Sequence, residues 1–168
     1  MSINRIAVVH PIQPNRLPIE LRVGESLHYR SSTARQSFSV SSREPKGPVN
    51  VHIAVTSGRV FVTSQRFIYI TDSQGDVDSF SFEFSAGPAC HFSHSLKTPW
   101  FGPNFWSFLF FCPPDSTCDG FPKNEWFEGK ISFKDGGLFD FASVVDRAIN
   151  DVVNNPHIDE DLPRYSST

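Results

Sequence analysis

Alternation of apolar and polar side chains with a period of two recurs in several short stretches of this chain. The clearest run covers residues 49–55, where four β-branched side chains fall on one face, and this indicates a half-buried β-strand. The Gly136–Gly137 turn predicts a hairpin, with residues 138–141 as its returning strand. Other runs of strand character lie at residues 19–23, 37–41, 60–63, 67–70, 80–84, 105–111 and 131–134.

One stretch near the end of the chain has helical spacing instead. Phe141, Val145, Ala148 and Val152 share a face with polar residues opposite them, and the Asn-Asn-Pro sequence at 154–156 should end this helix. A single amphipathic helix has one apolar stripe, which needs a surface to cover. We therefore expect a mainly β fold, a bent sheet or a partly open barrel of roughly seven strands, capped by this C-terminal α-helix.

The loops fit one domain with a tail. Prolines and polar residues mark loop insertions near residues 41–48 and 112–123. A chain of 168 residues suits a single domain. We expect this domain to span residues 1–155 and to be followed by an acidic, disordered tail over residues 156–168.

The composition narrows the function and the cellular setting. The 17 phenylalanines and the single methionine suit strand faces better than a helical bundle. A net charge of −3 offers no basic excess for phosphates, so no direct specific contact with nucleic acid is expected. The cysteines are not spaced as a disulfide framework, and no run of about 18 apolar residues occurs. We expect a soluble, reduced and monomeric protein of the cytoplasm and nucleus.

The sequence contains no recognisable enzyme motif. Neither a G-x-S-x-G nucleophile turn nor a glycine-rich phosphate loop occurs. Cys90, His91 and His94 leave a metal site as an alternative, but Cys112 and Cys118 are not spaced like the remaining ligands of a zinc site. The other interpretation is that Cys90 is a small core residue and that both histidines lie on a wet strand or loop. We expect no enzymatic activity, no metal and no cofactor.

Two segments carry a resemblance to a known family. Residues 58–69 read GRVFVTSQRFIY, with a glycine before an apolar strand, Thr63 opening a turn and Arg66 three residues later. Residues 98–105 read TPWFGPNF and fit the pattern P-x-F-G-x-N-aromatic. The first segment resembles the signature of GRAM domains, and the second resembles the WW-domain-binding protein 2 family. This resemblance spans residues 20–153 and implies a PH-like GRAM domain with an adaptor or coactivator-like role.

The tail holds a short motif of the kind by which this family recruits its partners. The family usually carries P-P-x-Y repeats, which this sequence does not contain. Leu162, Pro163 and Tyr165 instead form an L-P-x-Y motif, an accepted variant of that ligand for WW domains. Pro163 presets a polyproline II turn, and Tyr165 offers a ring to a groove. The resemblance implies recruitment of a WW-domain protein, such as a ubiquitin ligase or a transcriptional regulator; the alternative is a solvated tail without a partner.

Basic residues near the first strands suggest a function of a different class. PH-like domains place their ligand loops there, so a basic cluster could clamp a phosphoinositide headgroup and make the chain a peripheral membrane module. The same residues also fit an ordinary solvated loop. The pairs Trp100–Phe101 and Trp126–Phe127 are either exposed anchors or packing residues, and packing is the more frequent case in a small barrel. The basic residues are Arg30, Arg35, Arg43 and Lys46.

Overall fold

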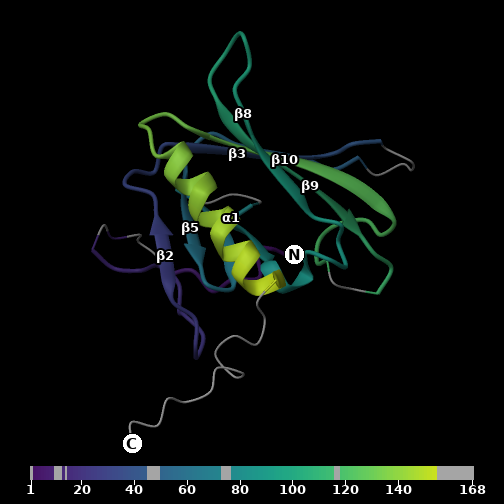
Figure 1. The fold of residues 1–168 in the computed structure, drawn as a ribbon, viewed down its shortest axis with the longest axis horizontal. Coiled ribbons are helices and arrows are strands. Elements are labelled where there is room, and N and C mark those ends of the chain that lie inside the picture. The colour runs from purple at the N-terminus through teal and green to yellow at the C-terminus, as the bar shows by residue number, and fades with distance from the viewer. Residues whose placement is uncertain are drawn as a thin grey trace, which may run out of the picture.

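The computed structural model of the chain describes residues 2–9, 13, 15–44, 50–72, 77–115 and 118–154. Within these residues, ten strands form two antiparallel five-stranded sheets, and one long helix follows the last strand (Figure 1). Sheet A has the order β1 (Ser2–Ile3), β7 (Ser79–Glu83), β6 (Arg66–Thr71), β5 (Gly58–Thr63) and β2 (Leu27–Arg30). Sheet B has the order β4 (His52–Val55), β3 (Gln36–Ser42), β10 (Glu125–Phe133), β9 (Phe105–Cys112) and β8 (Ser93–Lys97).

Helix α1 (Leu138–Asn154) closes the space between the two sheets. It contacts β2 and β5 of sheet A, β8 and β9 of sheet B, and the short 3-10 helix η1 (Phe84–Ala86) (Figure 1). Its buried side chains are Leu138, Phe141, Val145 and Ala148, whose spacing places them on one face of a helix. In the part of the chain that the structure describes, no helix has the length and the apolarity needed to cross a membrane.

Aromatic rings fill the interior between the sheets. Phe108 of β9 lies with its ring centroid 5.5 Å from Phe67 and 5.8 Å from Phe80 of the opposite sheet. Trp106 of the same strand meets Phe141 of α1 edge to face at 5.1 Å. Offset and edge-to-face contacts of this kind add to the free energy that burial of the rings provides. The phenylalanine-rich composition is therefore accounted for by ring packing between two sheets.

A missing side chain makes room for this packing. Gly129 of β10 lies opposite Phe108 in the ladder, and a Cβ placed on Gly129 would come within 2.0 Å of the Phe108 ring. The ring therefore rests directly on the backbone of β10. Glycine inside a strand often marks such a close approach, although it weakens the strand itself.

The outer face of sheet A is covered by the N-terminal segment. Phe61, Ile68 and Ile70 point away from the main core and form a second apolar cluster with Ile19. Ile6, Val8, Leu17 and Leu21 pack against this cluster from the N-terminal side. Strand β6 is consequently buried on both faces along its whole length.

The structure confirms the predicted mainly β fold with one C-terminal helix. In keeping with the expected bent or partly open arrangement, the two sheets do not close into a barrel, because β1, β2, β4 and β8 remain at sheet edges within the described chain. Several single elements differ from the prediction. Residues 19–23 form no strand, since this segment packs its side chains on sheet A instead of pairing. Residues 138–141 are the first turn of α1 and not a returning strand. Three strands were not predicted, namely β1, β2 and β8.

The contact between Gly129 and Phe108 yields a stability prediction. Gly129→Ala should lower the free energy of unfolding by about 2 kcal/mol, because the new methyl group displaces a ring that has no free space around it. Urea denaturation at neutral pH measures this change. Ser39→Ala, on the outer face of neighbouring strand β3, is the control and should change the free energy by less than about 0.5 kcal/mol. Equal midpoints for the two variants would contradict this account of the packing.

Candidate docking site

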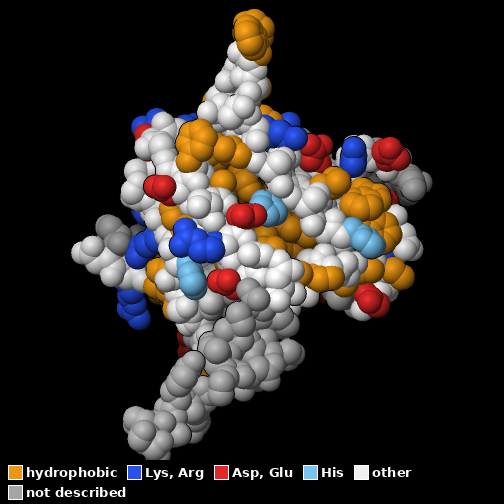
Figure 2. All heavy atoms as spheres, in the orientation of Figure 1, with side chains coloured by type: hydrophobic (Ala, Val, Ile, Leu, Met, Phe, Trp, Pro, Cys, Tyr) orange, Lys and Arg blue, Asp and Glu red, His pale blue; other side chains and the backbone are white. Residues whose placement is uncertain are grey.

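The most exposed aromatic residues lie at the end of a projecting hairpin. Strands β8 and β9 pair as far as Lys97 and Phe105, and residues 98–104 form the tip beyond that pair. Trp100 is 93% exposed and Phe101 is 86% exposed. Figure 2 shows this apolar tip standing clear of the rest of the surface. Adjacent large apolar side chains at such exposure gain nothing for the fold from burial, and contiguous exposed apolar surface of this kind often marks an interaction site.

The tip is carried by a well-anchored pair of strands. Trp106 and Phe108, which follow the tip on β9, are fully buried in the core. At the root of the hairpin, the Lys130 ammonium lies 5.0 Å from the centroid of the Phe105 ring, a cation–π contact. Gly102 turns the chain at the tip with a φ of 95°, which glycine adopts without strain.

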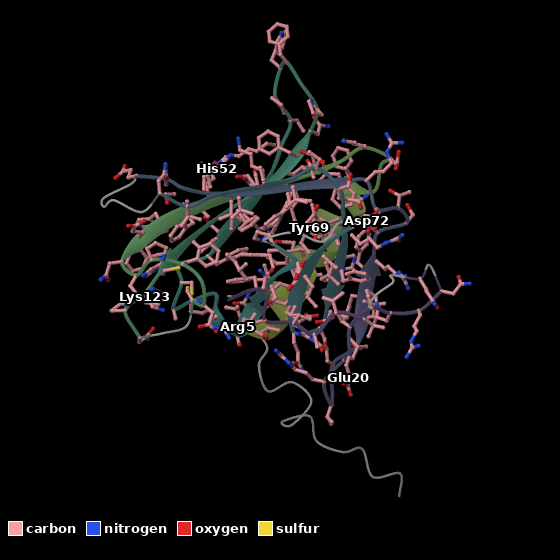
Figure 3. All side chains as sticks on the ribbon, turned by 180° about the vertical axis from the view of Figure 1, so that it is seen from behind. Arg5, Glu20, His52, Tyr69, Asp72 and Lys123 are labelled. Atoms are coloured by element: carbon pink, nitrogen blue, oxygen red, sulfur yellow. The ribbon has the colours of Figure 1, made fainter. Side chains whose placement is uncertain are left out.

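The outer face of sheet B lies on the same side of the molecule as the tip. In Figures 1 and 3 the hairpin rises on the side of sheet B that faces away from sheet A and α1. A shallow hollow of about 300 Å³ on this face is lined by Arg43, Lys97 and Glu128, among others. Lys97 and Lys130 are exposed near the root of the hairpin. Three cations and the carboxylate of Glu128 therefore lie on the side from which the aromatic tip projects.

The three described residues of the predicted headgroup clamp lie on different parts of the structure. Arg35 precedes β3 and Arg43 follows it, and this strand of seven residues separates their Cα atoms by about 26 Å. Arg30 lies on β2, where its guanidinium donates hydrogen bonds to the carbonyl oxygens of Gln13 and Arg16 at 3.1 and 3.3 Å. Lys46 lies outside the described residues. A clamp by all four residues remains a prediction.

Two of the three described arginines already have structural partners. The Arg30 guanidinium also lies 5.8 Å from the centroid of the Phe61 ring, on the face that the N-terminal segment covers. Arg35 pairs with Asp135 at 3.3 Å. Arg43, by contrast, lines the hollow with Lys97 on the outer face of sheet B. Of these three arginines, Arg43 is therefore the one whose side chain faces the hollow beside the hairpin.

The cluster of Cys90, His91 and His94 is divided between different surroundings. Cys90 is fully buried with its sulfur 4.0 Å from that of Cys118. His91 is exposed. His94 is half-buried and accepts a hydrogen bond from the Trp106 indole at 3.3 Å, and burial lowers the pKa of its imidazole. Among the residues described, no three histidine, cysteine or acidic side chains are placed to hold a metal ion.

The second predicted aromatic pair is split across sheet B. Phe127 is fully buried in the core, whereas Trp126 lies on the outer face and is 36% exposed. The Trp126 ring is 5.3 Å from Phe111 and 6.1 Å from His91. The expectation of packing holds for this pair. It is wrong for Trp100 and Phe101, because they lie beyond the last residue pair of the hairpin, where no other element reaches them.

Thr63 and Arg66, from the first segment of the resemblance, form a buried hydrogen-bond network with Glu25 and not an exposed site. The Arg66 guanidinium donates to the Glu25 carboxylate at 2.9 Å, with side-chain exposures of 7% and 0%. The Thr63 hydroxyl donates to the same carboxylate at 2.6 Å and accepts from the Arg66 amide at 3.0 Å. These bonds tie the segment before β2 to the turn between β5 and β6. The spacing of Thr63 and Arg66 in this segment is therefore explained by their contribution to the stability of the fold.

Comparisons with known proteins bear on the fold. No protein-family model matches the sequence, and no curated protein matches it. Among solved structures, the Vps36 N-terminal PH domain is similar to this chain, with a TM-score of 0.54 over 81% of this chain and 87% of that chain. The chain folds as a PH-like domain. At 20% sequence identity the likeness is one of fold, so it confirms the predicted PH-like architecture and leaves membership of the WW-domain-binding protein 2 family a prediction.

The buried network of Glu25, Arg66 and Thr63 makes the stability of this PH-like domain depend on pH. Burial alone raises the pKa of Glu25, but hydrogen bonds from Arg66 and Thr63 outweigh burial and lower this pKa below its usual value. The unfolded-state pKa of a glutamate is about 4.3. The stabilisation is therefore fully present above that pH, and it is lost as the pH falls through the lower folded-state pKa.

We expect Glu25→Gln to lower the free energy of unfolding at neutral pH by about 3 kcal/mol, because it leaves Arg66 buried without its counter-charge. The loss should shrink in urea titrations repeated at acid pH, below about pH 4, where the wild-type carboxylate is itself being neutralised. Glu83→Gln is the matched control: it removes a carboxylate from a partly exposed pair with Arg22 and should cost less than about 1 kcal/mol. A pH-independent difference between wild type and Glu25→Gln would refute the assignment.

Proposed function

We propose that this protein is a non-enzymatic adaptor of the WW-domain-binding protein 2 kind. Its PH-like body docks through the tip of the β8–β9 hairpin, and its tail motif recruits a WW-domain protein, such as a ubiquitin ligase or a transcriptional regulator, in the cytoplasm or nucleus. The observation that carries the docking role is the exposure of Trp100 and Phe101. These two residues lie within residues 98–105, the more specific segment of the resemblance.

The tail motif supports the recruiting role through its place in the chain. Every strand and helix that the structure describes ends at or before Asn154, and Leu162, Pro163 and Tyr165 come after it. The motif therefore follows the last described element of the fold in sequence.

The two proposed binding elements start from opposite ends of the molecule. The hairpin tip lies at one end of the view in Figure 1, and α1 runs so that its last residues lie toward the other end. The tip and the end of α1, after which the tail begins, therefore lie on different sides of the body. Joining two partners is the action that defines an adaptor.

We expect Tyr165→Ala to weaken binding of the full chain to a WW domain at least about tenfold, since a tyrosine that fills a groove is a typical hot spot. Titration calorimetry with isolated WW domains from ubiquitin ligases and transcriptional regulators measures the change. Pro163→Ala should act in the same direction, because the preset polyproline II turn is lost.

Arg164→Ala provides the matched control, because it alters the variable position of the motif and leaves its fixed residues in place. It should bind as the wild type does. The recruiting role is refuted if Tyr165→Ala binds as tightly as Arg164→Ala, or if none of the WW domains binds the unaltered chain.

A further inference from the structure

The hairpin tip has a shape that suits a deformable partner. It is convex, and its apolar side chains, Trp100 and Phe101 between Pro99 and Pro103, lie on a narrow projection that stands clear of the surface (Figure 2). A stable protein interface covers about 800 Å² on each partner around an apolar core. A narrow tip reaches such an area only in a partner that has a deep pocket of matching shape. A lipid bilayer needs no matching shape, because its interface accepts tryptophan and phenylalanine side chains from any projecting loop.

Charge around the tip favours the surface of a bilayer. Between Glu83 and Asp115 the sequence has no acidic residue, although the whole chain has a net charge of −3. Lys97 and Lys130 are exposed at the root of the hairpin, and Arg43 lines a hollow with Lys97 on the same side of the molecule. Glu128 is the acidic residue that lines this hollow. The hairpin itself therefore offers a bilayer a lysine and no carboxylate, and the hollow beside it adds Arg43 and Glu128.

We propose that Trp100 and Phe101 insert into the interface of a phospholipid bilayer, with Lys97, Lys130 and Arg43 facing its anionic headgroups. This inference rests on the docking role given above to the hairpin tip, and it names the partner of that site. It differs from the headgroup clamp that the sequence suggested, because apolar insertion supplies the affinity and the basic side chains add to it. Helix α1 would then end on the side away from the membrane, and the tail would start there (Figure 1).

The test uses the full chain carrying Trp126→Phe, so that Trp100 is the exposed indole while Trp106 stays buried. Three vesicle preparations separate the sources of affinity: phosphatidylcholine alone, phosphatidylcholine with phosphatidylserine, and phosphatidylcholine with a phosphoinositide. We expect binding to both kinds of anionic vesicle, with a blue shift of tryptophan emission and quenching by lipids brominated on their acyl chains. The signal should persist at high salt more than that of a purely electrostatic contact does.

Variants assign the effect to the tip. Trp100→Ser combined with Phe101→Ser should weaken vesicle binding at least roughly tenfold, since burial of two aromatic side chains is lost. Lys97→Ala should weaken binding to phosphatidylserine vesicles roughly fivefold, as expected for one cation near an anionic surface. Val23→Ser is the control, because Val23 is equally exposed and belongs to the loop before β2, which lies on the side away from the tip (Figure 1).

Several results would overturn the inference. One is that the double variant binds vesicles as strongly as the wild type does, and another is that the chain binds while the Trp100 emission is neither shifted nor quenched. Failure of the unaltered chain to bind any of the vesicles would also contradict the inference. If the double variant still binds phosphoinositide vesicles, the chain binds the lipid headgroup through a clamp and not by insertion of the tip. The double variant should still bind WW domains as the wild type does, so loss of vesicle binding and loss of tail recruitment are read separately.

Discussion

The packing of aromatic rings between two sheets sets the geometry on which the other features depend. Phe108 lies among rings of both sheets, and it can do so because β10 has Gly129 beneath it. A ring has few rotamers and a large area, so neighbouring rings fix one another's positions. The spacing of the sheets and the register of β9 against β10 follow from this fit. Strand β9 is the same strand that continues into the exposed tip.

Much of the fold was predictable from the sequence, and the exceptions have physical causes. The strand at residues 37–41 alternates because only one of its faces is in the core. The strands at residues 60–63 and 67–70 are nearly continuous apolar runs because both of their faces are covered. Strand β8 was missed because Ser93 and Ser95 give its outer face little contrast with a loop, and β2 is only four residues long. Residues 19–23 alternate like a strand, yet their apolar side chains serve to cover sheet A.

The candidate site was less predictable than the fold. The residue types at the tip, a tryptophan and a phenylalanine between prolines, are equally suited to a core, and only the length of the β8–β9 pairing shows that they lie outside it. The basic residues were near one another in sequence, but β3 carries Arg35 and Arg43 to opposite ends. The tail motif, in contrast, can be identified from the sequence alone, because a partner binds a linear peptide motif without any tertiary structure around it.

The course of β9 from the tip into the core has a mechanical consequence. Because Trp106 and Phe108 are buried in the core, and β8 and β9 stay paired up to Lys97 and Phe105, a surface that holds the tip also limits the tilt of the whole domain. Part of the orientational entropy of docking is then lost in this first step. A second partner that approaches α1 from the other side meets a body whose direction is already restricted.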